Sequence, residues 1–248
     1  HALGYVGRIN EQELKSIDPV AYAGTHYIGK TGIERYYEQL LHGTVGYEEV
    51  ETNARGRVLR VLNRTDPIPG RDLTLELDVK LQQVAEEALG DRRGAVVAID
   101  PATGGVLAFV SKPGFDPNLF VTGISYADYG ALRDSLDQPL FNRVLRGQYP
   151  PGSTIKPIVA LAGLDAGVVT RTSRVYDPGF YQLPNVSHKY RNWNRSGDGW
   201  VDMSYAIARS NDTYFYDLAN KLGIDRMHDF MSQFGIGQRV SIDMYEEA

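Results

Sequence analysis

The sequence predicts an α+β fold, in which strands and helices occupy separate stretches of the chain instead of alternating. Apolar runs at 95–99 and 106–110 flank a turn-rich segment at 100–105, which is typical of an antiparallel hairpin. From residue 153 onward helical segments dominate, and glycines follow most of them. The 248 residues, 42% of them hydrophobic, suffice for one large domain and a smaller piece.

Residues 1–90 are predicted to form an α+β accessory region. Residues 32–41 have helical character. The segments 58–62 and 73–77 alternate in hydrophobicity like half-buried strands, and a run of breakers rich in proline separates them. We therefore expect one helix and two strands in the larger part of this region.

A helix is predicted to join the accessory region to a second domain at 91–248. Asp78 stands where a helix N-cap belongs, apolar residues follow at helical spacing, and Gly90 ends the helix. The second domain is predicted to open with the hairpin described above, as the start of a mostly buried antiparallel sheet. Its predicted helices are 153–166, 202–208, 213–222 and 225–234.

The composition argues against several kinds of site and partner. A net charge of -5 and a pI of about 5.6 give no concentrated basic surface, so nucleic acid is not an expected partner. The chain has no cysteine, which rules out disulfides, thiolate zinc sites and cysteine nucleophiles. The histidines lack metal-ligand spacing, so we expect neither a metal nor a cofactor.

The N-terminal sequence indicates a fragment. The chain begins at His1 without an initiator methionine, and it lacks the basic and apolar regions of a signal peptide. No window approaches the roughly 18 uninterrupted apolar residues of a membrane span. We expect any membrane anchor to lie upstream of this chain.

Ser153, with Lys156 three residues later, is the strongest candidate for chemistry. The turn-forming Pro-Pro-Gly at 150–152 delivers Ser153 to the first turn of an apolar helix, where residues three apart share one face. A serine nucleophile needs a base, and a lysine can serve where burial or a nearby cation lowers its pKa. The helix N-terminus favours an oxyanion. Because Ser-x-x-Lys also occurs by chance, the alternative is an N-capping serine with a solvated lysine.

A second polar cluster, Ser210-Asn211-Asp212, lies between two predicted helices. Serine, asparagine and aspartate are the usual N-cap residues, so a simple capping loop is the alternative interpretation. Two polar clusters at the starts of neighbouring helices can face one pocket. We therefore predict a single site that combines this cluster with Ser153 and Lys156.

These two motifs, Ser-x-x-Lys and Ser-x-Asp, resemble those of the penicillin-binding proteins and serine β-lactamases, and the sequence around them is similar to that of the class B penicillin-binding proteins. Nearly the whole chain takes part in the resemblance. It implies a non-catalytic pedestal, related to a dimerisation domain, at 1–90. It also implies the N-terminal part of a transpeptidase domain, an antiparallel sheet with helices, at 91–248. The segments that carry the resemblance are 29–46 and 70–75 for the pedestal, 94–104 and 114–118 for the start of the transpeptidase domain, and 149–157 and 177–184 for the branch that serves cell elongation and cell shape in Gram-negative bacteria.

The resemblance implies a peptidoglycan D,D-transpeptidase and assigns roles to the site residues. Ser153 would attack the penultimate D-Ala carbonyl of a stem peptide, release the terminal D-Ala and leave an acyl-enzyme, which an amine of a neighbouring strand would resolve into a cross-link. Lys156 would accept the serine proton, and Ser210 would relay a proton to the departing or attacking amine. β-Lactams would mimic the donor and trap Ser153. The other candidates are Asp212 as a catalytic residue and Asn211, Tyr149 and Trp193 as substrate-binding residues.

The resemblance also implies a location and partners. The protein would work at the periplasmic face of the bacterial inner membrane, anchored by an upstream helix. Its partners would be peptidoglycan stem peptides, a membrane glycan polymerase and other proteins of the elongation complex. No cofactor is implied.

The sequence departs from the family pattern in two places. Asp212 stands where asparagine is usual, and a carboxylate there changes the charge beside Lys156. The third motif, Lys-Thr/Ser-Gly, does not follow Ser210, and the copy at 30–32 lies in the pedestal, where we interpret it as coincidence. The chain as given is therefore expected to be catalytically incomplete.

Two alternatives to a transpeptidase remain open. A D,D-carboxypeptidase or β-lactamase on the same scaffold would use water as the acceptor, although the pedestal argues against it. A penicillin sensor or scaffold would acylate slowly or not at all and act through partners.

Overall fold

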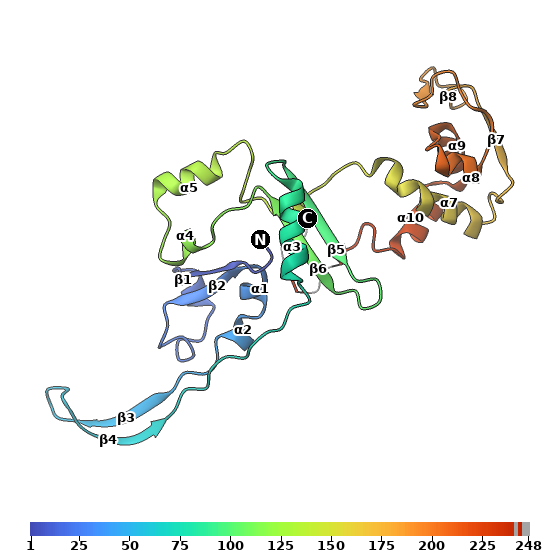
Figure 1. The fold of residues 1–248 in the computed structure, drawn as a ribbon. Coiled ribbons are helices and arrows are strands. Elements are labelled where there is room, and N and C mark those ends of the chain that lie inside the picture. The colour runs from blue at the N-terminus through green and yellow to red at the C-terminus, as the bar shows by residue number, and fades with distance from the viewer. Residues whose placement is uncertain (241–242, 245–248) are drawn as a thin grey trace. The chain divides into compact units, whose positions relative to one another are not determined.

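The chain contains helices and strands in two compact units (Figure 1). The structure, a computed structural model, describes residues 1–240 and 243–244. His1–Gln148 form the first unit and Tyr149–Val240 form the second. Within the described residues, every sheet is an antiparallel pair of strands, and each pair stays within one unit. The predicted α+β class is confirmed.

The first unit begins with two hairpin-like pairs. Strand β1 (Tyr5–Arg8) pairs with β2 (Tyr27–Thr31), and β3 (Tyr47–Thr52) pairs with β4 (Val58–Thr65). Strand β4 includes the predicted strand at 58–62, whereas β3 was not predicted, because half of the residues in its sequence YEEVET are glutamates. All but one of the residues in this second pair are exposed.

The helix predicted at 32–41 is interrupted. It is α1 (Gly32–Tyr36) followed by α2 (Glu38–Leu41), and the backbone of Tyr37 between them leaves the helical region at φ -98° and ψ 17°. The carboxylate of Glu38 accepts hydrogen bonds from the Gly29 backbone at 2.7 Å and from the Tyr22 hydroxyl at 3.0 Å. We attribute the break to these tertiary bonds, which fix Glu38 in place.

The strand predicted at 73–77 is wrong. Leu73, Leu75 and Leu77 are half-buried and the residues between them are exposed, so the predicted alternation of burial is present. However, these residues form no strand and belong to none of the described strand pairs. The alternating hydrophobicity correctly predicted which side chains are half-buried, but it does not determine whether the main chain pairs with another strand.

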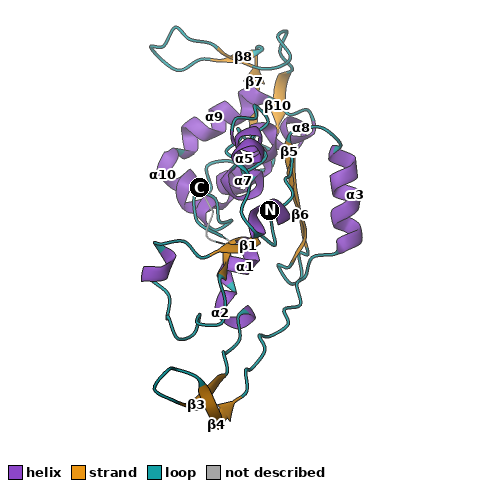
Figure 2. Cartoon of the chain, turned by 90° about the vertical axis from the view of Figure 1, so that its left-hand side faces the viewer, coloured by secondary structure: helices purple, strands orange, loops and turns teal. Residues whose placement is uncertain are grey.

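The linking helix and the hairpin that follows it form as predicted. Helix α3 (Val79–Leu89) is capped by Asp78, whose carboxylate accepts from the backbone N–H groups of Lys80 and Leu81. Strands β5 (Gly94–Ile99) and β6 (Val106–Lys112) pair antiparallel, and α3 packs against β6 (Figure 2). The side chain of Gln82 on α3 bonds both backbone groups of Phe109 on β6.

The hairpin is less buried than predicted. Strand β6 contains four consecutive buried residues, but β5 alternates between half-buried and exposed positions, with Ile99 57% exposed. The remaining helices of the first unit are short: the 3-10 helix η1 (Glu13–Lys15), α4 (Asn118–Val121), α5 (Tyr126–Arg133) and α6 (Arg143–Arg146).

The second unit is built around four helices. The predicted helices are confirmed with small shifts in their ends, and the first of them opens with a 3-10 turn. Their buried faces form one apolar core, which includes Val159, Ala206 and Leu218. The helices are η2 (Gly152–Ile155) leading into α7 (Lys156–Asp165), α8 (Met203–Ala208), α9 (Asp212–Leu222) and α10 (Ile224–Ser232).

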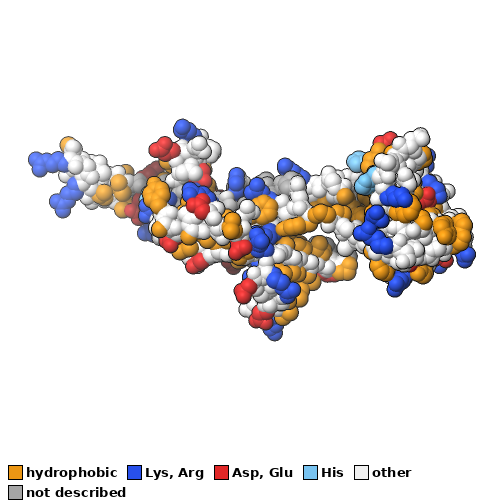
Figure 3. All heavy atoms as spheres, turned by 90° about the horizontal axis from the view of Figure 1, so that it is seen from above, with side chains coloured by type: hydrophobic (Ala, Val, Ile, Leu, Met, Phe, Trp, Pro, Cys, Tyr) orange, Lys and Arg blue, Asp and Glu red, His pale blue; other side chains and the backbone are white. Residues whose placement is uncertain are grey.

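Between α7 and α8 the chain forms short strands that were not predicted. Strand β7 (Arg174–Asp177) pairs with β10 (Gly199–Asp202), and β8 (Phe180–Tyr181) pairs with β9 (Tyr190–Arg191). The first of these pairs brings Asp177 and Gly199 opposite each other. On the face shown in Figure 3, hydrophobic side chains are interspersed with charged ones over both units.

Candidate active site

Ser153 lies on an exposed turn at the entrance to α7. Gly152 before it has φ +56°, in the left-handed region where only glycine is unstrained, and Pro151 before that has φ -66°. The Pro-Pro-Gly sequence therefore sets the direction in which the chain enters η2 and α7. Ser153 is exposed, as a nucleophile must be to meet a substrate.

Lys156 is the first residue of α7 and is 8% exposed. Its ammonium Nζ donates to the Ser210 carbonyl oxygen at 2.8 Å, to Ser210 Oγ at 3.1 Å and to Asp212 Oδ1 at 2.6 Å. It also lies 5.6 Å from the centre of the Phe215 ring. The solvated lysine of the alternative interpretation is therefore wrong.

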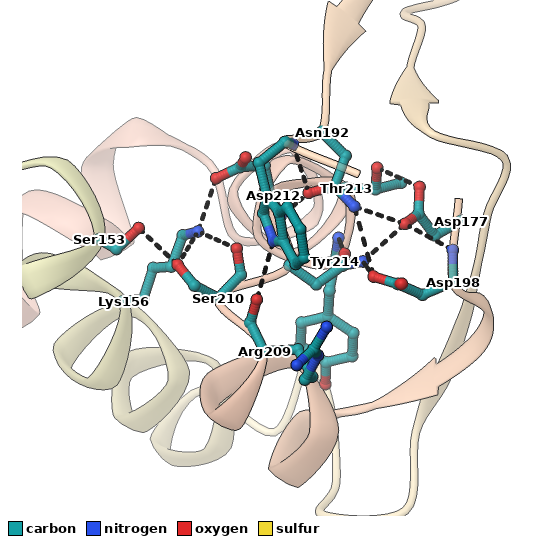
Figure 4. A network of polar contacts seen from close by, with 12 residues as sticks. Ser153, Lys156, Asp177, Asn192, Asp198, Arg209, Ser210, Asp212, Thr213 and Tyr214 are labelled. Carbon is teal, nitrogen blue, oxygen red and sulfur yellow. Dashed lines mark hydrogen bonds and ion pairs between the residues drawn. The ribbon is translucent and has the colours of Figure 1, made fainter. Parts of the chain in front are cut away.

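Ser210 links Lys156 to Ser153. Ser210 Oγ donates to Ser153 Oγ at 2.6 Å while it accepts from Lys156, so the three side chains form a continuous hydrogen-bonded row (Figure 4). Among the described residues no hydrogen bond joins Lys156 directly to Ser153. The helical spacing predicted their proximity, but the connection between them runs through a residue 54 positions along the chain from Lys156.

Asp212 supplies the charge that faces Lys156. It is the first residue of α9, and its carboxylate forms an ion pair with the ammonium at 2.6 Å, with side-chain exposures of 10% for the lysine and 26% for the aspartate. An ion pair this little exposed is screened less by solvent than a surface pair. The predicted single site is thus assembled from η2, α7 and the turn before α9.

A network of polar side chains behind Ser210 was missed by the sequence analysis (Figure 4). Asp177, at the end of β7, is 1% exposed, and its carboxylate accepts from the side chains of Asn192, Asn211 and Thr213 at 2.7, 2.6 and 2.6 Å. Asp198 accepts a further bond from Asn211 at 2.9 Å. Besides the family resemblance of residues 177–184, the sequence signal at Asp177 was the turn Asp-Pro-Gly at 177–179, which indicates a bend but no site.

Comparison with known proteins matches this geometry to a family. Residues 94–248 match the family described as "Penicillin binding protein transpeptidase domain", and residues 1–75 match the "Penicillin-binding Protein dimerisation domain". The chain belongs to the class B penicillin-binding proteins. The resemblance predicted from the motifs is confirmed, whereas the division of the chain at residues 90 and 91 stays a prediction.

Among the individual relatives that the chain matches are MrdA and PBP2 proteins. It is 57% identical over 248 residues to the peptidoglycan D,D-transpeptidase MrdA of Acinetobacter baumannii. It superimposes on the crystal structure of Pseudomonas aeruginosa PBP2 in complex with WCK 5153 with a TM-score of 0.91 and a sequence identity of 68%. It superimposes on Helicobacter pylori PBP2 in complex with MreC with a TM-score of 0.91 and a sequence identity of 34%. All of the chain is covered in each comparison, but it spans only 37% of the MrdA sequence and 51% and 46% of the two PBP2 chains.

The three predicted substrate-binding residues of this penicillin-binding protein chain lie in different surroundings. Trp193 is 55% exposed, with its indole N–H donating to the Arg209 carbonyl and the Arg209 guanidinium over its ring. Tyr149 is also exposed. Asn211 is fully buried; its amide nitrogen donates to Asp177, and its amide oxygen accepts from the backbone N–H of Tyr214. Substrate binding by all three stays a prediction, and the burial of Asn211 does not favour it.

The described part of the chain offers neither a metal centre nor a membrane span. Within residues 1–240 and 243–244, no group of three or more His, Asp or Glu side chains is placed to hold a metal ion. Over the same residues, no helix has the length and apolar character needed to cross a membrane.

Proposed function

We propose that this chain carries the acylating serine of a peptidoglycan D,D-transpeptidase that cross-links stem peptides during cell elongation and the maintenance of cell shape. The observation that carries the proposal is the row of hydrogen bonds from Ser153 through Ser210 to Lys156. In this row Ser153 is the nucleophile, Ser210 is the proton relay and Lys156 is the terminal base.

In the acylation step, Ser153 Oγ attacks the carbonyl carbon of the penultimate D-Ala. In this step Lys156 Nζ is the unprotonated base, so the two hydrogen bonds first run from Ser153 to Ser210 and from Ser210 to Lys156. The serine proton passes to Ser210 Oγ as the proton of Ser210 passes to Lys156 Nζ. After the transfer Lys156 donates to Ser210 and Ser210 donates to Ser153, which is the direction of these bonds in the structure. The carbon–nitrogen bond then breaks, and the terminal D-Ala leaves as an amine that takes a proton back along the same row. The product is an ester on Ser153.

In the second step, the amine of a neighbouring stem peptide attacks the ester. Its proton returns through Ser210 towards Lys156 and then to Ser153 Oγ as the ester bond breaks, which restores the free serine and forms the cross-link. The 2.8 Å bond from Lys156 to the Ser210 carbonyl holds the relay residue while its hydroxyl changes partners. Asp212 balances the charge that Lys156 acquires in each step.

The relatives support this assignment. The A. baumannii protein is named a peptidoglycan D,D-transpeptidase, and a solved structure shows H. pylori PBP2 together with MreC. We propose the same activity for the protein that contains this chain, a location at the periplasmic face of the inner membrane, and assembly with a glycan polymerase and other elongation proteins. β-Lactams are the expected covalent inhibitors, with Ser153 as the residue they acylate.

The test uses the full-length protein and a stem peptide that ends in D-Ala-D-Ala, with a second peptide as amine acceptor. We expect D-Ala release and cross-linked product from the wild type and neither from Ser153→Ala. The matched control is Ser204→Ala, which removes an exposed serine hydroxyl on α8 of the same unit and should leave both products unchanged. Release of D-Ala with water as the only acceptor would assign a carboxypeptidase instead, and an inactive wild type that still binds partners would assign a scaffold.

A further inference from the structure

The carboxylate of Asp177 is the centre of the buried network behind Ser210. Oδ2 accepts from Asn192 Nδ2 at 2.7 Å, from Asn211 Nδ2 at 2.6 Å and from the Asp198 backbone N–H at 3.1 Å. Oδ1 accepts from the Gly179 backbone N–H at 2.7 Å and from Thr213 Oγ1 at 2.6 Å. Five donors from separate parts of the second unit therefore converge on one side chain, which is 1% exposed.

The network fixes both residues that follow Ser210. Asn211 is fully buried, with its amide nitrogen on Asp177 and Asp198 and its amide oxygen on the Tyr214 backbone N–H. The backbone N–H of Asp212 donates to Asn192 Oδ1 at 3.1 Å, and Asn192 is held in turn by Asp177. The turn at 210–212 is thus anchored on its C-terminal side by side chains that all depend on one carboxylate.

Ser210 itself needs such an anchor, because its backbone adopts φ +53°, in the left-handed region. A serine reaches this conformation only at a cost in free energy, and it persists where the surroundings enforce it. In this conformation the carbonyl of Ser210 faces Lys156 while Ser210 Oγ meets both Lys156 and Ser153. Relaxation to a right-handed backbone would redirect these groups.

The charge of Asp177 is maintained by hydrogen bonds. Burial raises the pKa of Asp177, but the bonds from Thr213, the Gly179 backbone, Asn211 and Asn192 outweigh burial and hold the pKa below its ordinary value. No ion pair to Asp177 occurs in the described part of the chain. The carboxylate therefore remains ionised at neutral pH, and all five donors retain their acceptor.

We propose that Asp177 is a positioning residue: through Asn192 and Asn211 it holds the turn at 210–212 in the left-handed conformation that places Ser210 Oγ between Lys156 and Ser153. The proposal rests on the proposed function, because it gives Asp177 an effect on acylation of Ser153. If Asp177 had only a structural role, its replacement would slow acylation with or without the Ser210 hydroxyl, whereas a positioning role requires that hydroxyl.

The first experiment measures acylation of the full-length protein by a fluorescent penicillin. Asp177→Asn replaces one carboxylate oxygen with an NH₂ group that meets N–H or O–H donors, so the turn should shift. We expect acylation to slow by about 10- to 100-fold, the loss that a displacement of about 1 Å in a reacting group causes. The control is Leu218→Ala, which opens a cavity in the core on the same helix as Asp212 without touching the network. Both variants are assayed well below their melting temperatures, and Leu218→Ala should be acylated at close to the wild-type rate.

The second experiment repeats Asp177→Asn in a Ser210→Ala background. If Asp177 acts by aiming Ser210, the slowing caused by Asp177→Asn must largely disappear once the Ser210 hydroxyl is absent. Equal slowing in both backgrounds would overturn the proposal, and so would an Asp177→Asn protein acylated at the rate of Leu218→Ala. An unlabelled wild type would overturn the proposed function instead, so the two failures are distinguishable.

Thr213→Val provides a milder variant for the case in which Asp177→Asn does not fold. It keeps the shape of the side chain and removes one of the five donors, the hydroxyl that lies 2.6 Å from Asp177 Oδ1. We expect a smaller slowing of acylation than with Asp177→Asn, again dependent on the Ser210 hydroxyl. Acylation at the wild-type rate, or slowing that persists in Ser210→Ala, would contradict the proposal.

Discussion

Asp212→Asn tests how strongly Lys156 depends on a charged partner. Two aspartates of helix α9 form ion pairs of the same length, 2.6 Å: Asp212 with Lys156 of α7, and Asp217 with Lys221 of α9 itself. The lysines differ in exposure, at 10% for Lys156 and 50% for Lys221. The second pair is therefore a control within the same helix.

The magnitude follows from this difference. At an effective dielectric constant of about 20, two charges about 4 Å apart attract by about 4 kcal/mol, from which the cost of removing Lys156 from water must be subtracted. Asparagine keeps an oxygen for Lys156 to bond, so we expect a coupling energy of about 2 kcal/mol between Asp212→Asn and Lys156→Met. For Asp217→Asn and Lys221→Met, a pair one helical turn apart whose lysine is 50% exposed, we expect about 0.4 kcal/mol.

The assay is urea unfolding of the chain, with the four proteins of each double-mutant cycle compared at neutral pH. The two tryptophans of the chain, Trp193 and Trp200, both lie in the second unit and report its unfolding by fluorescence. Added salt should weaken the Lys221 pair more than the Lys156 pair. Equal coupling energies for the two pairs, or a smaller value for Lys156, would refute the claim that this ion pair is shielded from solvent.

Three further predictions concern the surroundings of the site. The pKa of Asp177 is lower in the folded protein than in the unfolded chain, so the ionised carboxylate stabilises the fold. This contribution is complete above about pH 3.9, the unfolded value, and is lost as the pH falls through the lower folded pKa. Urea midpoints measured from pH 7 to 2 should therefore show a loss of stability in the wild type that Asp177→Ala lacks. Gly152→Ala should destabilise the second unit by about 1–2 kcal/mol, and only through the backbone φ of +56°, because a Cβ there meets nothing within 4 Å. Gly130 on helix α5 has equally open space around it, so Gly130→Ala should stabilise the protein by about 0.5–1 kcal/mol. Gly163→Ala should cost about 1–3 kcal/mol, because its Cβ would lie 2.7 Å from Leu218 Cδ1, and Leu218→Ala in the same chain should recover part of that loss.

The parts of the site that sequence could predict are those set by local rules. Pro-Pro-Gly before an apolar helix placed Ser153 at a helix entrance, and helical spacing brought Lys156 near it. The polar break before α9 placed Ser210 and Asp212 at the next helix start. In each case the decisive interactions lie within a few residues, where spacing and capping preferences apply.

The rest depends on tertiary contacts that leave no period in the sequence. Asp177, Asn192 and Asp198 come from short strands and turns, and their side chains meet only after the chain between α7 and α8 has folded back. The left-handed backbone of Ser210 has no local signal, because serine normally avoids it. The strand predicted at 73–77 failed although its local signal, the alternation of half-buried and exposed residues, is present. A strand also needs a neighbouring strand to pair with, and the sequence of the segment does not encode that neighbour.

The most direct test of the account is to identify the residue that a β-lactam acylates. After reaction of the full-length protein with penicillin, trypsin should release residues 147–171 as one peptide, because Lys156 is followed by proline and is not cleaved. We predict that this peptide gains the mass of the antibiotic, that fragment ions place the addition on Ser153 and not on Thr154, and that the gain is absent in Ser153→Ala. Addition to any other residue, or an unmodified peptide after prolonged reaction, would contradict the assignment of Ser153 as the nucleophile.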